Sequence, residues 1–235
     1  MNGIPTAADF QLGRVTNPGQ SEIIRQPLYD SLLYAAAGQQ ELKFFQTPKG
    51  QGLTTAVGAT ANNPKTAADT NMVMAGTLPS GQEMLVESIE VAFYPGSVST
   101  ANTYTIDALT FFLAAASAVP TAQVDDVNAF YQSGWLEFNI LAKNYLTQAP
   151  LGCFPPKTQL AVGGAIASNS ATTAEVGFSL ARQVGRPWYV DPKIDLMPAM
   201  NFDVTLKWPG LVATTSTFNG RVMVNLDGFL LRASQ

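Results

Sequence analysis

The chain contains no histidine, and this absence removes much of the chemistry that proteins commonly use. Histidine titrates near neutral pH and is the commonest metal ligand, so the usual general base, the triad base and most transition-metal sites are excluded together. The single cysteine, Cys153, excludes an internal disulfide framework and a zinc site built from several cysteines. We therefore predict a structural or binding role, with no enzyme activity, no cofactor and no metal site.

Charged residues are also scarce. They make up 13% of the chain, against roughly 25% in an ordinary soluble domain. The net charge is −4, and the 13 basic residues are scattered along the sequence, so we expect no strong direct binding to nucleic acid. Uncharged polar residues and alanine must supply much of the surface, a composition common where subunits pack closely.

Long hydrophobic runs are missing as well. The most apolar segment, residues 108–119, is shorter than the roughly 20 residues needed to span a bilayer. The first ten residues lack the basic and apolar regions of a secretory signal, so we expect neither a signal peptide nor a membrane span.

Residues 1–40 are predicted to form an N-terminal arm that carries a short helix at about 27–37. Pro27 suits the first turn of this helix, and Gly38 suits its C-terminal stop. The apolar stripe of the helix would consist of Leu28, Leu32 and Leu33. Because this stripe must be buried against the same chain or a neighbour, we take the three leucines as candidate interface residues.

From residue 41 onward the hydrophobic period changes towards two, as in β-strands. Alternation is clear in Ile89, Val91 and Phe93, and Asp227-Gly228 suggests a bulge in the last strand. A short helix is expected at 124–131, and loops are expected at 47–69, 149–156 and 188–198. The eight predicted strands lie near residues 42–45, 88–94, 104–113, 136–140, 159–166, 175–184, 202–208 and 221–232.

Eight strands without crossover helices predict an all-β, antiparallel sandwich, and the number of strands matches a jelly roll. An immunoglobulin-like sandwich is the competing topology, but it usually needs only about 100 residues. Since the sequence has no internal repeat, we expect one jelly-roll domain at 41–235 behind the arm at 1–40.

Three passages carry a resemblance to the jelly-roll major capsid proteins of tailless icosahedral bacteriophages. They are residues 69–72 with 75–79, residues 142–145 with 150–151 and 154–155, and residues 224–232 before the end at Gln235. The resemblance implies a virion protein that assembles into capsomers and then into a closed icosahedral shell, with itself and other capsid or spike proteins as partners. It implies no catalytic residues.

One departure concerns the arm. Many jelly-roll coat proteins of RNA viruses have a strongly basic arm, whereas residues 1–40 hold Arg14 and Arg25 against Asp9, Glu22 and Asp30. We therefore expect the arm to contact a neighbouring subunit, a second protein or an inner membrane rather than to condense a genome.

Several side chains allow a second interpretation. Asp125 and Asp126 suit calcium, but they suit a helix N-terminus better, because no EF-hand spacing surrounds them. The acids Asp191, Asp195 and Asp203 lie in or near the 188–198 region. They would support glycoside hydrolysis only if a cleft brought two of them together.

Among the aromatic residues, Trp188 and Tyr189 are the best candidates for contact with a partner, and Trp208 is predicted to be buried. We expect an interface at Trp188 and Tyr189; the alternative function is a carbohydrate-binding β-sandwich.

Overall fold

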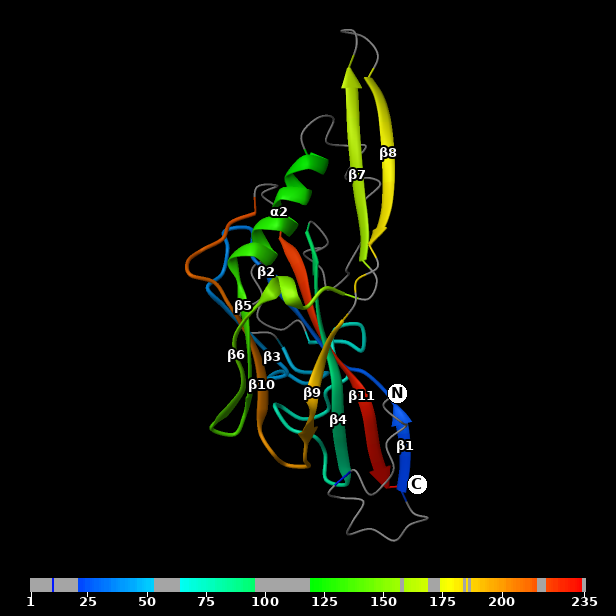
Figure 1. Cartoon of the computed structure of the whole chain (residues 1–235), viewed down its shortest axis with the longest axis vertical. Helices are drawn as coiled ribbons and strands as arrows, with labels where there is room; N and C mark the ends of the chain where they lie inside the picture. Colours follow the sequence, from blue (N-terminus) through cyan, green and yellow to red (C-terminus); the bar gives the residue numbers. More distant parts are fainter. Residues whose placement is uncertain are drawn as a thin grey trace.

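The computed structural model describes residues 10, 21–52, 64–95, 119–156, 159–168, 174–183, 185, 187–214 and 219–233. Two antiparallel sheets pack in a sandwich-like arrangement (Figure 1). The first sheet contains β1 (Ser21–Arg25), β2 (Leu28–Tyr34), β4 (Gln82–Tyr94), β9 (Trp188–Leu196) and β11 (Gly220–Ala233). The second contains β3 (Glu41–Phe44), β5 (Trp135–Ile140), β6 (Lys143–Pro150) and β10 (Phe202–Lys207).

The last strand organises the first sheet. One side of β11 pairs with β4, and the other side pairs with β1 and β2 in succession, so that Arg25 faces Phe229 and Leu28 faces Leu226. Pro27 lies between β1 and β2, where its missing N–H removes no ladder hydrogen bond. The sheet order is β1-β11-β4-β9, with β2 also on β11.

The predicted helix at 27–37 is wrong, because residues 28–34 form strand β2. Leu28 and Leu32 point into the core between the sheets, and Leu33 is buried on the opposite face of the strand. The stripe that a helix would have presented to a neighbour does not exist. Residues 21–25 and 28–34 of the predicted arm pair within the first sheet. Gly38, with a φ of 86°, turns the chain after β2 beside the backbone of Val212.

Strict alternation is confirmed in strand β5 of the second sheet. Leu136, Phe138 and Ile140 of β5 are buried while their neighbours are half-exposed. Phe202, Val204 and Leu206 of β10 pair with these residues and fill the same core, and Val204 and Leu206 also pair with β3. Strand β4 is longer than predicted and is buried on both faces, so Ser88 and Glu90 are as enclosed as Ile89 and Val91.

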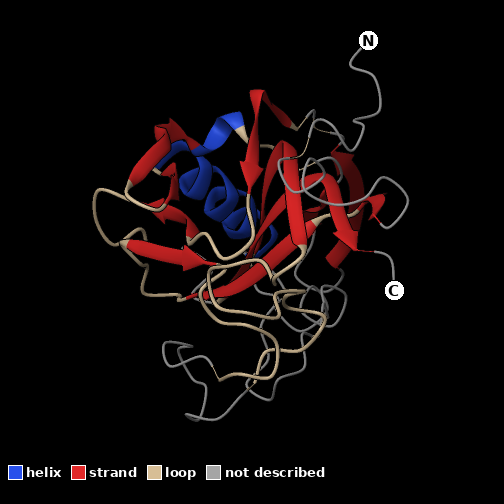
Figure 2. Cartoon of the chain, turned by 90° about the horizontal axis from the view of Figure 1, so that it is seen from below, coloured by secondary structure: helices blue, strands red, loops and turns tan. Residues whose placement is uncertain are grey.

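The helix predicted at 124–131 is longer and forms α2 (Val119–Ser133). Its Phe130 stacks on Phe93 with ring centroids 4.4 Å apart and an interplanar angle of 11°. Tyr34 and Trp208 enclose the same ring, and the Trp208 indole N–H donates to the Phe130 carbonyl at 3.3 Å. Trp208 is buried as predicted. In the view along the long axis, α2 lies among the strands (Figure 2). The aromatic cluster joins the helix to both sheets.

The described residues form eleven strands, not eight. Strand β6 was expected to be a connection and β9 a loop, whereas the predicted strand at 104–113 lies outside the described residues. The predicted bulge at Asp227-Gly228 is confirmed by a register shift between β11 and β4. Cys153, in the short 3-10 helix η3 (Leu151–Cys153), is half-buried against the core rather than fully buried.

The two strands predicted at 159–166 and 175–184 are confirmed as β7 (Gln159–Ser168) and β8 (Ala174–Gln183). They pair antiparallel along their whole length, and among the described strands they pair with each other alone. Figure 1 shows this hairpin extending away from the sandwich beyond α2.

Candidate interaction surface

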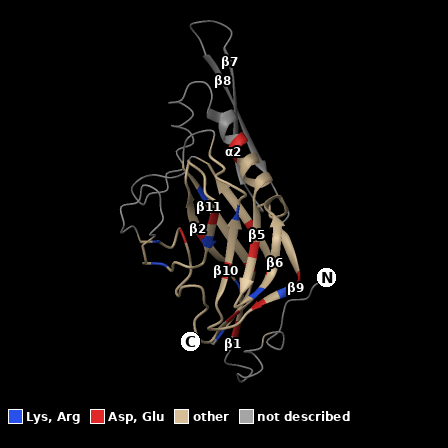
Figure 3. Ribbon diagram, turned by 90° about the vertical axis from the view of Figure 1, so that its left-hand side faces the viewer, with Lys and Arg blue, Asp and Glu red and all other residues tan. Residues whose placement is uncertain are grey.

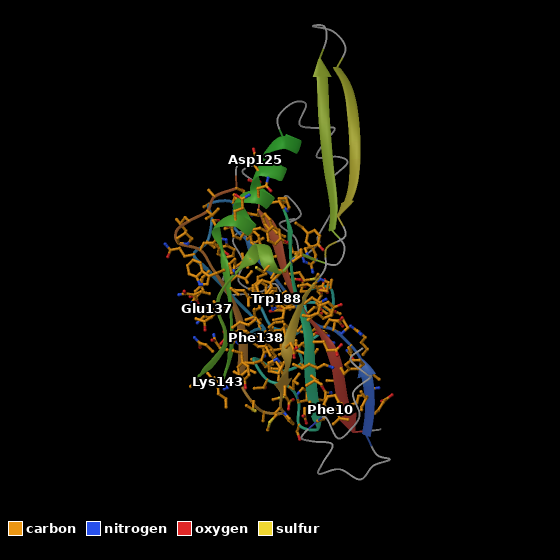
Figure 4. All side chains as sticks on the ribbon, in the orientation of Figure 1. Phe10, Asp125, Glu137, Phe138, Lys143 and Trp188 are labelled. Carbon is orange, nitrogen blue, oxygen red and sulfur yellow. The ribbon has the colours of Figure 1, made fainter. Side chains whose placement is uncertain are left out.

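Two neighbouring aromatic side chains are exposed on β9, an edge strand of the first sheet among the described residues. Trp188 is 42% exposed and Tyr189 is 55% exposed. Both belong to the candidate interface predicted from the sequence, although they lie on a strand rather than in a loop. Figure 4 places Trp188 midway along the molecule. We call these two residues the aromatic edge.

The two rings belong to opposite faces of the strand. Trp188 pairs with Ile89, a core residue, and its ring lies 5.7 Å from that of buried Phe154. Tyr189 pairs with Ser88 and so belongs to the outer face of the first sheet. Trp188 is thus packed on Phe154 at the core side of the strand, while Tyr189 is more than half exposed on the outer face.

Four charged side chains on the same outer face are paired with one another. The Arg25 guanidinium contacts the Asp227 carboxylate at 2.7 Å and that of Glu87 at 3.8 Å, and Lys193 forms an ion pair with Glu87. The hydrogen bond that Arg25 donates to Asp227 raises the pKa of Arg25 above its ordinary value. Arg25 also lies over the Phe229 ring, 5.5 Å from its centroid.

The outer face of the second sheet repeats this arrangement. The Lys207 ammonium contacts the Glu137 carboxylate at 2.7 Å, and the Trp135 indole N–H donates to the same carboxylate at 3.0 Å. The pKa of Glu137 is lowered, and the hydrogen bond from Lys207 is the largest cause of this shift. Figure 3 shows how few charged residues the described strands carry. The charged side chains named for these two faces therefore have ion-pair partners within the same chain.

A second group of exposed apolar side chains, Val73, Met74 and Leu141, lies at one end of the sandwich. The Leu141 N–H donates to Asn201, and the Phe202 N–H donates to Gly76, so the segments that carry these side chains meet at that end. Tyr145 of β6 is exposed near the same turn.

The structure places Asp203 in a different sheet from the other two acids that the hydrolase alternative would use. Asp203 lies on β10 in the second sheet and is held by Asn139 and Thr205, whereas Asp191 and Asp195 lie on β9 in the first. Asp125 and Asp126 lie within α2 rather than at its N-terminus, so that interpretation is wrong. Among the described residues, no group of three or more Cys, Asp or Glu side chains is placed to hold a metal ion.

Sequence reasoning missed an acidic pair that the fold creates. Glu83 of β4 and Asp195 of β9 share a hydrogen bond, although they lie 112 positions apart in the sequence. Burial, then the charge of Glu83 and that hydrogen bond, raises the pKa of Asp195 from its ordinary 3.8 to about 7. Because residues 188–198 were expected to form a loop, no local signal pointed to the pairing of β4 with β9.

None of the described helices combines the length and apolar character needed to cross a membrane. Comparisons with known protein families, with curated proteins and with solved structures find no match for this chain. The assignment of function therefore depends on the geometry and composition described above.

Proposed function

We propose that this chain is a structural subunit that assembles with copies of itself, and specifically the jelly-roll major capsid subunit of a tailless icosahedral bacteriophage. The observation that carries the proposal is the aromatic edge: two exposed rings on an edge strand of a sandwich, on a sheet whose Arg25–Asp227 and Lys193–Glu87 charges are paired within the chain. Such a surface offers contact area without a large penalty for removing free charges from water.

The composition supports the same proposal. Only 13% of residues are charged, and the exposed apolar side chains Val73, Met74 and Leu141 provide a second region at the end of the sandwich. A closed shell requires each subunit to present more than one contact surface, because a single self-complementary patch stops at a dimer. The virion is the location that this function implies, with other capsid or spike proteins as partners and an inner membrane as a further contact.

The role of the aromatic edge can be tested with Tyr189→Ser, which removes the more exposed ring and leaves the Trp188 anchor on Phe154 in place. Leu211→Ser is the matched control, because Leu211 is exposed but follows β10 in a different part of the fold. Sedimentation velocity should show large species for the wild type and the control, and a shift to smaller species for Tyr189→Ser. If Tyr189→Ser assembles like the wild type, the aromatic edge is not an assembly contact.

The alternative function, carbohydrate binding, is favoured by one observation, which is that two adjacent aromatic side chains are exposed. Rings of this kind stack on sugars as well as on protein surfaces. Screening the wild-type chain on a glycan array separates the two functions. Saturable binding that is lost in Tyr189→Ser, from a chain that stays monomeric, would replace the capsid proposal with a glycan-binding one.

A further inference from the structure

Asp30 occupies an inward position of strand β2. Its neighbours on the same face, Leu28 and Leu32, belong to the core between the sheets, and its cross-strand partner Val224 is fully buried. A carboxylate in such apolar surroundings is costly unless a cation or hydrogen-bond donors compensate it. Burial is accordingly the largest influence on the pKa of Asp30 and raises it. The site therefore favours a form of Asp30 that carries no charge.

Lys65 reaches the same enclosed site from a different segment of the chain. Its Nζ atom lies 2.5 Å from the Oδ1 atom of Asp30, and neither side chain has any exposed surface. The Lys65 N–H donates to the Gln51 carbonyl, and the Lys65 carbonyl accepts the Gly50 N–H, each at 2.8 Å. The amine and the carboxyl are therefore held in contact by backbone that is fixed independently of the pair.

The second oxygen of Asp30 has a donor of its own. Oδ2 accepts the Phe45 N–H at 2.6 Å, and the Thr70 side chain is a further hydrogen-bond partner of the carboxyl. Phe45 donates this bond from a left-handed conformation, with a φ of 68°, that a bulky residue rarely adopts. A backbone N–H aimed at a carboxyl oxygen stabilises the negative charge that develops there when a nucleophile attacks the carbon. The two oxygens thus differ, because Oδ1 faces the amine and Oδ2 faces an oxyanion donor.

We propose that Lys65 and Asp30 condense into an intramolecular isopeptide bond. A proton passes from the Lys65 ammonium to Oδ1 of Asp30, which leaves a neutral amine beside a neutral acid. The Nζ lone pair attacks the Cγ atom, and a C–N bond forms while the bond from Cγ to Oδ1 breaks. Oδ1 leaves as water with two of the three ammonium protons, Nζ keeps the third, and Oδ2 becomes the amide oxygen. The reaction needs no oxidant, reductant or cofactor.

The bond removes a cost that the ion pair retains. Two buried charges lose their hydration, and their mutual attraction often fails to offset that loss. The amide carries no charge and keeps the hydrogen bond from Phe45. Because the fold holds the two groups in contact, little entropy is lost when they react, and burial excludes the water that would hydrolyse the product. The bond is independent of the proposed function, so either can fail without the other.

Intact mass spectrometry of the full chain, denatured after folding, tests the proposal. We expect the mass to be lower, by one water molecule, than the 25.0 kDa mass of the sequence. Trypsin does not cut after an acylated lysine, so digestion should release residues 26–43 joined to residues 50–143, and fragmentation of that product locates the bond. A wild-type chain that keeps its full sequence mass after prolonged incubation at pH 7 would overturn the proposal.

Two variants test whether these side chains lose the water. Lys65→Met and Asp30→Ala should each have the full mass of their sequence. Lys43→Met is the matched control, because Lys43 forms an exposed ion pair with Glu41, and this variant should still lack one water molecule. A missing water that persists in Lys65→Met would place the dehydration elsewhere and overturn the proposal. Circular dichroism checks that each variant is folded, and the joined tryptic product of the wild type decides the question if neither is.

Discussion

The Lys65 ammonium lies 2.5 Å from the Asp30 carboxylate, and both side chains are completely buried. The second oxygen of Asp30 accepts the Phe45 N–H at 2.6 Å. These contacts attach the segments on either side of residues 53–63 to β2. Burial is the largest influence on Asp30 and raises its pKa, and the Lys65 charge opposes that effect.

Removing one partner of this ion pair should destabilise the fold strongly. Lys65→Met leaves a buried acid without its cation, and we expect the free energy of unfolding to fall by about 3 kcal/mol. Urea denaturation at pH 7 measures the change. Lys43→Met is the control, because Lys43 forms an exposed pair with Glu41 at 3.3 Å and should change stability by less than about 1 kcal/mol. Equal effects of the two variants would contradict this account of Asp30.

Truncating Phe130 should detach α2 from the sandwich. The ring is fully buried between Tyr34, Phe93 and Trp208, so Phe130→Ala is expected to lower the free energy of unfolding by about 3–5 kcal/mol. Tyr145→Ala removes an exposed aromatic ring and should change stability by about 0.5 kcal/mol or less. Thermal denaturation followed by circular dichroism compares the two. A loss below about 1 kcal/mol in Phe130→Ala would show that the cluster does not hold the helix.

A side chain at the β11 bulge should not be tolerated. A Cβ atom at Gly228 would lie 2.0 Å from the Leu85 carbonyl oxygen, so Gly228→Ala must displace β11 from β4. We expect loss of soluble, folded protein or a destabilisation of more than about 3 kcal/mol. Gly210→Ala, whose Cβ would have no neighbour within 4 Å, should express and melt like the wild type. A Gly228→Ala chain as stable as the wild type would show that β11 does not approach the Leu85 backbone this closely at Gly228.

Stability should depend on pH through Asp195. Its pKa is about 7 in the folded chain and near 3.8 in the unfolded chain, so the folded state retains a proton that the unfolded state releases between these values. The free energy of unfolding should therefore fall as pH rises from about 4 to 7 and level off above. Asp195→Asn should exceed the wild type by about 1–3 kcal/mol at pH 8 and by much less at pH 4. The raised pKa of Asp30 acts in the same direction in both proteins and cancels in the comparison. A difference that does not grow with pH would contradict the assignment.

Local alternation was sufficient to predict the strands whose two faces differ in exposure. Strands β3, β5 and β10 were found because their buried residues are apolar and their neighbours are not. Strand β2 was predicted as a helix because one of its inward positions is Asp30, whose partner Lys65 is 35 residues away. With that polar residue inside, the leucines matched a helical spacing better than a strand.

The remaining misses have comparable physical causes. Strand β6 is exposed along nearly its whole length, so it lacks the alternation of a half-buried strand. Strand β9 contains Asp191-Pro192, a dipeptide typical of turns, and it pairs with β4 on both sides of an irregularity. Trp188 and Tyr189 were correctly expected to be accessible, whereas the acidic pair depends on a register between strands more than 90 residues apart.

The central claim, that the chain is a self-assembling structural subunit, is tested most directly by its native mass. Light scattering with negative-stain imaging, at several salt and protein concentrations, compares the particle mass with the 25.0 kDa of one chain. We predict trimers, pentamers, hexamers or closed shells. A stable 25.0 kDa monomer under every condition would contradict the claim.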